Sequence, residues 1–134
     1  MQTTKYQTIY KQLDDILNLE EFLKHDVGFN VKLKSSGFMD LSIEILKKAS
    51  EFVRISMSHY GEQNGDLMAD PDMEIKIYPK NKMAEALTFQ NDYLGIYQVA
   101  YPEANKLYPK LKQELNIFLV QWLSNLKCQG FKRL

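Results

Sequence analysis

The sequence predicts an α+β fold, in which an antiparallel meander of five or six strands carries N-terminal and C-terminal helices packed on one face. Three observations lead to this prediction. Apolar residues recur at helical spacing near both ends of the chain, and at a period of two between them. The gaps between the alternating segments are short and turn-like. A strong apolar stripe runs along the last helical segment.

The N-terminal segment is predicted to be a helix, with Thr3 or Thr4 available as its N-cap. Asn18 and Glu21 have the spacing of a capping box, which predicts a second short helix running to about Lys24. The apolar positions of the first helix are Ile9, Leu13, Ile16 and Leu17.

Residues 29–101 alternate between apolar and polar, as strands with one buried and one solvated face do. The gaps "SSGFM", "LKKAS", "PKNK" and "NDYLG" have the composition of hairpin turns. Connections this short leave no room for parallel crossovers, so the sheet is predicted to be antiparallel. The apolar positions are Phe29, Val31 and Leu33; Leu41, Ile43 and Ile45; Val53, Ile55 and Met57; Met73, Ile75 and Ile77; Leu87 and Phe89; and Tyr97, Val99 and Tyr101.

The C-terminal segment is predicted to be a helix that begins near Pro109 and ends before Gly130. We expect its apolar stripe to cover the sheet rather than to bind a partner. The stripe consists of Leu111, Leu115, Phe118, Trp122 and Leu126, with Leu119 and Leu123 beside it.

Length and composition predict an ordinary globular protein of one domain, residues 1–134. Seventeen basic residues balance seventeen acidic ones, so net charge does not indicate direct nucleic-acid binding. The single cysteine, Cys128, rules out an intrachain disulfide and a cysteine-based zinc site. The chain shows no apolar signal core and no apolar run of membrane-spanning length, so we expect a cytoplasmic protein without a membrane partner.

The segment HYGEQNGDLMADPDMEIKIY, residues 59–78, concentrates the candidate functional side chains. Alternation continued from Met57 places His59 at a strand end, on the core side. The connection to the next strand then spans about a dozen residues, a length typical of functional loops. The Asn64-Gly65 pair predicts a tight turn within it. The expected binding residues are His59, Tyr60, Glu62, Asn64, Asp66, Asp70, Asp72 and Glu74.

Two chemical interpretations of this segment stay open. His59 with Asp66, Asp70 and Asp72 offers ligands for magnesium, manganese or calcium, although the spacing matches no EF-hand. His59 is also a candidate general base, although no serine or cysteine nucleophile lies in a known motif. Cys128 falls in the last turn of a helix, where the helix dipole disfavours the thiolate.

Two non-catalytic interpretations stay open beside them. In the first, His59 caps the sheet edge, and Asn64, Asp66 and Asp70 only bond loop amides. In the second, an acidic recognition hairpin faces a basic partner protein. The carboxylates of that hairpin are Glu62, Asp66, Asp70, Asp72 and Glu74.

Residues 55–126 resemble two families of uncharacterised bacterial proteins. The motif of the first, often found on phages, plasmids and integrative elements, is His59-Tyr60, then residues 63–66 (Gln-Asn-Gly-Asp), then Asp70-Pro71. The stretch "NDYLGIYQVAYP" resembles its later Asp-x-x-Gly strand, at Asp92 and Gly95. The stretches "KMAEALTFQ" and "LNIFLVQWL" are similar to the second family. The resemblance implies a mobile-element accessory protein and brings no catalytic residue, metal or cofactor.

Two hypotheses from different classes follow. The first is a non-enzymatic protein that binds a host or mobile-element protein through the hairpin and the adjacent polar sheet face, with a regulatory or anti-defence role. The second is a small metal-assisted enzyme acting on a phosphate-containing substrate at His59 and the neighbouring aspartates. The sequence identifies neither the partner nor the oligomeric state.

Overall fold

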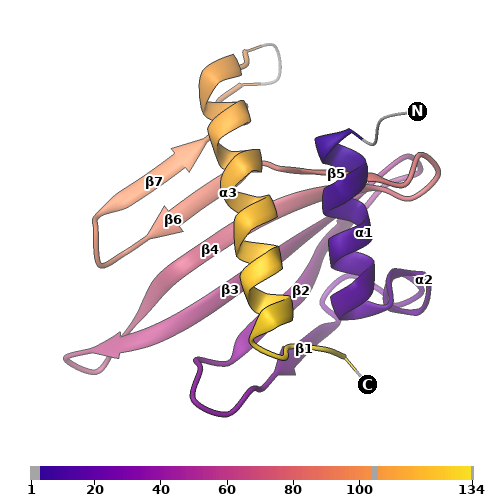
Figure 1. Cartoon of the computed structure of the whole chain (residues 1–134). Helices are drawn as coiled ribbons and strands as arrows, with labels where there is room; N and C mark the ends of the chain where they lie inside the picture. The colour runs from indigo at the N-terminus through magenta and orange to yellow at the C-terminus, as the bar shows by residue number, and fades with distance from the viewer. Residues whose placement is uncertain (1–3, 104–105, 134) are drawn as a thin grey trace.

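A computed structural model describes residues 4–103 and 106–133 of the chain. The protein forms two layers, one antiparallel sheet and a layer of helices on one of its faces (Figure 1). The predicted α+β fold is confirmed. Among the described residues, the sheet contains seven strands rather than five or six.

Helix α1 (Lys5–Leu17) begins after Thr4. The Thr4 hydroxyl accepts the amide N–H of Gln7, and the Gln7 side chain accepts the amide N–H of Thr4. This capping box confirms Thr4 as the N-cap, whereas Thr3 lies outside the described residues. The four predicted apolar positions are all buried: Ile9, Leu13, Ile16 and Leu17.

Helix α2 (Leu19–Phe22) is shorter than predicted, and its cap differs from the prediction. The Asn18 side chain makes no capping hydrogen bond; instead Asp14 Oδ1 accepts the Leu19 amide at 2.9 Å. Asn18 already ends α1 in the left-handed conformation, with φ of 55°. It therefore lacks the extended backbone from which an N-cap side chain normally acts.

The sheet runs in the order β1-β2-β3-β4-β6-β7, and every pair is antiparallel as predicted. β5 and β6 pair with successive parts of one edge of β4. The strands are β1 (Asn30–Leu33), β2 (Leu41–Lys48), β3 (Val53–Gln63), β4 (Asp66–Tyr78), β5 (Met83–Ala86), β6 (Thr88–Asn91) and β7 (Ile96–Val99).

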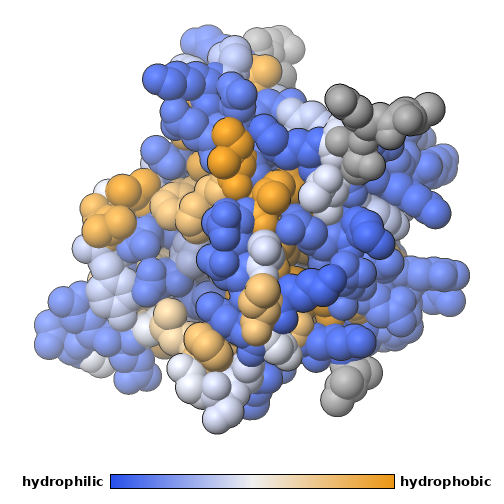
Figure 2. Space-filling model, viewed as in Figure 1, coloured by the Kyte–Doolittle hydropathy of each residue, from blue (hydrophilic) through white to orange (hydrophobic). Residues whose placement is uncertain are grey.

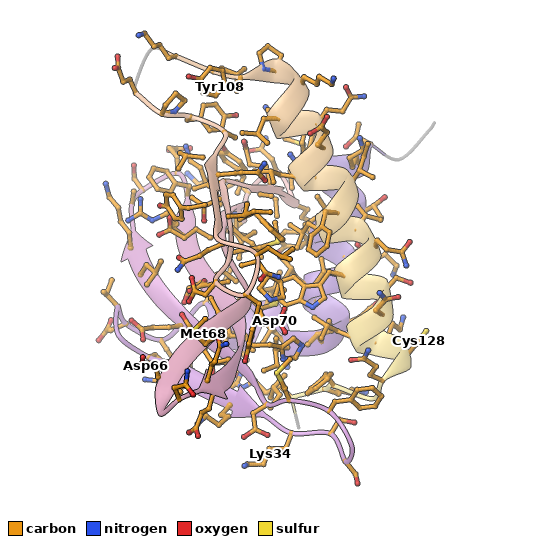
Figure 3. All side chains as sticks on the ribbon, turned by 90° about the vertical axis from the view of Figure 1, so that its left-hand side faces the viewer. Lys34, Asp66, Met68, Asp70, Tyr108 and Cys128 are labelled. Carbon is orange, nitrogen blue, oxygen red and sulfur yellow. The ribbon has the colours of Figure 1, made fainter. Side chains whose placement is uncertain are left out.

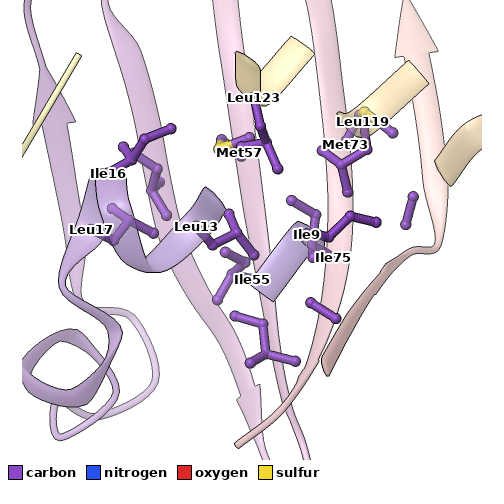
Figure 4. Close-up of a cluster of buried hydrophobic side chains, with 14 of the residues drawn as sticks. Ile9, Leu13, Ile16, Leu17, Ile55, Met57, Met73, Ile75, Leu119 and Leu123 are labelled. Carbon is purple, nitrogen blue, oxygen red and sulfur yellow. The ribbon is translucent and has the colours of Figure 1, made fainter. Parts of the chain in front are cut away.

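One face of the sheet is apolar and packs against the helices. Figure 4 shows Ile55 and Met57 of β3 and Met73 and Ile75 of β4 pointing into the same cluster as side chains of α1 and α3. Alternating burial along β2, β3 and β4 confirms the predicted inward positions of these strands. The core is therefore the layer between the sheet and the two long helices.

The last strand has the opposite orientation from the one predicted. Tyr97, Val99 and Tyr101 were expected on the core side, but Ala100 is the buried residue and Tyr97 is largely exposed. Val99 and Tyr101 line a groove on the other face of the sheet. Large residues on this edge strand face solvent while a small one fits against the core, so the size of the side chains misled the prediction.

Helix α3 (Pro109–Cys128) starts at the predicted proline and covers the sheet. Phe118 is partly exposed at the margin, with its ring 5.1 Å from that of Phe89. Gln12 Nε2 of α1 donates to the Val120 carbonyl of α3 at 3.1 Å, so the two helices also hold each other. The stripe is buried at Leu115, Leu119, Trp122, Leu123 and Leu126. Among the described residues, neither α3 nor any other helix has the length and apolarity needed to cross a membrane.

Candidate functional site

The segment predicted to be a loop of about a dozen residues is the outer end of a long hairpin. β3 continues to Gln63 and β4 starts at Asp66, with only Asn64 and Gly65 between them. Both turn residues have positive φ, 53° and 85°, as a type I′ turn requires. The predicted tight turn is confirmed, but the predicted loop around it is wrong, because pairing continues from Ser58–Asp72 to Gln63–Asp66.

His59 lies on the core side of β3, as predicted. Its Nδ1 is 3.0 Å from the Asp40 carbonyl, and its ring packs edge-on against Trp122 at 5.7 Å. Phe131 approaches the ring at 5.7 Å as well, and only 7% of His59 is exposed. The β3–β4 register shifts here because Asp70 and Pro71 of β4 stand opposite His59 alone, so the extra residue lies in β4 and β3 keeps its alternation. His59 therefore joins the helix-side core rather than the aspartates.

Tyr60 is tied to Asp72 across the hairpin. The Tyr60 hydroxyl donates to Asp72 Oδ2 at 2.5 Å. The pKa of Tyr60 is raised to about 12, mainly by partial burial and next by this hydrogen bond. The hydroxyl therefore remains a donor at neutral pH, and one oxygen of Asp72 is already occupied.

The turn between β6 and β7 fastens onto the same hairpin. Asp92 Oδ2 accepts the Ala69 amide at 2.7 Å, while the Asp92 amide donates to the Ala69 carbonyl at 2.9 Å. Asp70 Oδ1 accepts from Asn91 Nδ2 at 3.1 Å. Hydrogen bonds from the Gln90 side chain and then from the Ala69 amide lower the pKa of Asp92. Asp70 and Asp92 thus hold two hairpins together.

Exposed apolar side chains lie on both of these hairpins. Leu67 is 68% exposed and Leu94 is 69% exposed. The Tyr93 hydroxyl lies 2.3 Å from the position that a Cβ on Gly61 would occupy, so this ring is seated on the backbone of β3. Figure 2 shows hydrophobic atoms at the left margin, where Figure 1 places the β6–β7 turn. We call this surface the hairpin end: Tyr60, Glu62, Asp66, Leu67, Tyr93 and Leu94.

We call the sheet face opposite the helices the open face. The strand registers show which side chains are neighbours on it, and three cross-strand rows are largely polar. One cross-strand row is Lys32, Ser42, Ser58, Asp72, Gln90 and Tyr97. The next is Asn30, Glu44, Ser56 and Glu74. A third is Lys47, Arg54, Lys76 and Glu85.

Charge is unevenly distributed along the open face. Glu44, Asp72 and Glu74 line one stretch of groove around the small side chain of Ser56. Basic residues follow in the third row, where Arg54 Nε stands 3.8 Å from Glu74 Oε1. The acidic part is nearer the hairpin end and the basic part is nearer the β2–β3 turn.

The structure therefore divides the predicted site residues among three places, the first of which is the helix-side core, where His59 lies. Glu62, Asn64 and Asp66 are exposed at the tip of the hairpin. Asp72 and Glu74 lie on the open face. Figure 3 shows Asp66, Met68 and Asp70 on the hairpin, with Cys128 far from them on α3.

This division bears on the metal and hydrolytic interpretations. They need His59 and the aspartates at one place, and His59 instead packs against Trp122. Within residues 4–103 and 106–133, no group of three histidine, cysteine or acidic side chains is placed to hold a metal ion.

Sequence reasoning missed part of the site. Tyr93 and Leu94 sit in a stretch that was assigned only as a turn, and their exposure depends on the contact between two hairpins. Glu85 was also missed: it accepts the hydroxyls of Tyr78 at 2.9 Å and Tyr101 at 2.6 Å. An acidic residue inside the run "MAEA" was the available signal, because a carboxylate between two alanines on a short strand needs partners.

No curated protein and no solved structure matches the chain. A family model does match it: the model described as a domain of unknown function, DUF6908, covers residues 5–132. The match spans both long helices and the whole sheet, including the hairpin end and the open face. The chain belongs to this family.

Proposed function

We propose that the chain is a non-enzymatic accessory protein of a mobile genetic element, and that it binds a host or element-encoded protein through the hairpin end and the adjoining acidic part of the open face. The mobile-element setting is supported by the resemblance of the His59 to Pro71 motif. The binding role is supported by the surface itself.

The observation that carries this proposal is the exposure of large apolar side chains on a rigid support. Leu67 and Leu94 stand out from two hairpins that are fastened by the paired hydrogen bonds between Ala69 and Asp92. Exposed apolar clusters rimmed by polar groups are typical of protein-binding surfaces. Backbone pairing orders this cluster before any partner arrives, which lowers the entropic cost of association.

The charges around the cluster indicate the chemistry of the partner. Glu62 and Asp66 flank the apolar residues at the tip, and Glu44 lies exposed on the nearby open face. A complementary surface carries an apolar centre with lysine or arginine around it. Charge complementarity of this kind mainly raises the association rate and weakens with salt.

Capture of partners from a host lysate tests the proposal with two pairs of variants. The first pair is Leu67→Ser with Leu94→Ser, against Ile117→Ser, an exposed apolar residue of α3. The second is Glu62→Lys with Asp66→Lys, against Glu51→Lys with Glu114→Lys, both exposed elsewhere.

We expect both hairpin-end variants to lose a partner that both controls retain. Retention of the same partner by both hairpin-end variants would contradict the proposal. Asp72 and Glu74 are unsuitable for charge reversal, because they hold the Tyr60 hydroxyl and the Arg54 side chain.

A further inference from the structure

A second site lies where β3 begins and β4 ends, at the opposite end of these strands from the Asn64-Gly65 turn. It is a cavity of about 430 Å³ on the open face, within the roughly 300–1,000 Å³ that small-molecule sites occupy. We propose that this cavity binds a small aromatic anion, a flat apolar ring that carries one carboxylate or phosphate group. Its walls are Phe52, Arg54, Glu74, Lys76, Tyr78, Leu87, Thr88, Val99 and Tyr101.

The positive charge of this cavity is only partly neutralised within the described residues. Lys47, Arg54 and Lys76 are cross-strand neighbours in one row. Glu74 is the carboxylate among the lining residues, and it lies 3.8 Å from Arg54 Nε. The excess cationic charge beside a partly enclosed surface favours an anion.

The other nearby carboxylate, Glu85, is already occupied. It faces Lys76 across the β4–β5 pair, but its oxygens accept the hydroxyls of Tyr78 and Tyr101. Lys112 of α3 stands 3.8 Å from Glu85 Oε1 and balances its charge. Glu85 therefore braces the wall of the cavity instead of neutralising Lys76.

Arg54 brings a guanidinium group to the wall of this cavity. Its Nε is buried and makes no hydrogen bond to the described residues. The Arg54 side chain as a whole is nevertheless 38% exposed and lines the cavity. An anionic oxygen there therefore meets the outer part of the guanidinium, beside Lys76. Guanidinium groups suit this role, because their planar donors match carboxylate and phosphate oxygens.

The aromatic and aliphatic walls of the cavity favour a ligand that carries an apolar ring. Lys76 Nζ lies 4.3 Å from the centre of the Phe52 ring, and Lys47 Nζ lies 5.7 Å from it, so the cations are held over an aromatic face. The hydroxyls of Tyr78 and Tyr101 point to Glu85, which leaves their rings as walls. Leu87 and Val99 complete the apolar lining. An anion without a ring would make no contact with these apolar walls.

Titration of the full chain by ¹H–¹⁵N NMR tests the site with phenyl phosphate as the probe. Three matched compounds accompany it: inorganic phosphate without the ring, phenol without the charge, and benzylamine with the opposite charge. We expect saturable shifts at the amides of Phe52, Lys76, Leu87 and Val99 with phenyl phosphate, and at least about tenfold weaker binding of each matched compound, equivalent to one lost charge-assisted contact.

Substitutions locate the binding. Arg54→Gln and Lys76→Gln are each expected to weaken phenyl phosphate about tenfold. Lys80→Gln is the control, because Lys80 follows the same strand but is exposed and pairs with Glu51. Lys76→Gln covers the case in which Arg54→Gln perturbs the fold, since no carboxylate of the described residues forms an ion pair with Lys76.

Four results would overturn the site: no saturation with phenyl phosphate, equal binding of inorganic phosphate, equal binding of benzylamine, or unchanged affinity in both glutamine variants. None of them bears on capture of a protein at the hairpin end, which lies at the opposite end of β3 and β4. Of the three carboxylates in the acidic part of the open face, Glu74 is the one that also lines the cavity.

Discussion

At the scale of single residues, a buried asparagine joins α3 to a short strand at the edge of the sheet. Trp122 follows from helical spacing and is buried. Asn116 lies in the same helix and is fully buried, because its Oδ1 accepts the Ala86 amide of β5 at 2.8 Å. Spacing alone does not reveal this role, since the acceptor is needed only where a short strand leaves an amide unpaired.

Asn116→Ala should therefore destabilise the protein by about 1–3 kcal/mol, because the buried Ala86 amide loses its acceptor. Asn125→Ala is the matched control, an exposed asparagine of the same helix, and should change the free energy of unfolding by less than about 0.5 kcal/mol. Urea denaturation measures both. Equal effects of the two substitutions would show that the hydrogen bond to β5 contributes nothing.

The lowered pKa of Asp92 predicts how its contribution to stability depends on pH. Its pKa in the folded state lies below the ordinary value of 3.8, so its contribution to stability is fully present above that value and is lost as pH falls through the folded pKa. An NMR titration should place the carboxyl midpoint below 3.8, with the Ala69 amide shift following it. Gln90→Ala should raise the midpoint, because it removes a donor. A midpoint at or above 3.8 in the wild type would contradict the Asp92 contacts.

At the scale of elements, the hairpin of β3 and β4 shows where the sequence is ambiguous. The Asn64-Gly65 turn was predictable from its residue types. Its surroundings were not, because β4 carries an extra residue opposite His59 and because Pro71 normally argues against a strand interior. Pairing on both sides of Pro71 overrides that local preference. The orientation of β7 was missed for a related reason, since an edge strand with tyrosines on one side has no unambiguous apolar face.

Gly65→Ala tests the turn. Gly65 has φ of +85°, and nothing lies within 4 Å of the position a Cβ would take. Gly65→Ala should therefore lower the free energy of unfolding through backbone strain alone, by about 1–2 kcal/mol. Gly65→Asn should cost less, because asparagine tolerates the left-handed region. Chemical denaturation measures the two variants, and a neutral Gly65→Ala would mean that the turn adopts another conformation.

At the scale of the whole molecule, the two layers were predictable and the division of charge was not. Seventeen acidic and seventeen basic residues give a formal net charge of zero. The sheet nevertheless distributes them unevenly, with Glu44, Asp72 and Glu74 in one stretch of groove and Lys47, Arg54 and Lys76 in the next row. Only the strand registers reveal this, because the charges come from segments far apart in the chain.

Trp122→Ala tests the layer arrangement. The side chain is 7% exposed between α3 and the sheet, beside the His59 ring. Its removal should cost about 3–5 kcal/mol, while Ile117→Ala on the exposed side of α3 should cost less than about 0.5 kcal/mol. A loss below about 1 kcal/mol for Trp122→Ala would mean that the stripe is a partner surface instead of core.

The proposal that the hairpin end binds a partner protein is tested most directly by amide hydrogen exchange on the captured complex. Exchange rates would be compared between the free chain and the same chain with its partner bound. We expect slowed exchange at residues 60–68 and 92–97, with the exposed side of α3 unchanged. Protection confined to α1 and α3, with the hairpin end exchanging as fast as in the free chain, would contradict the proposal.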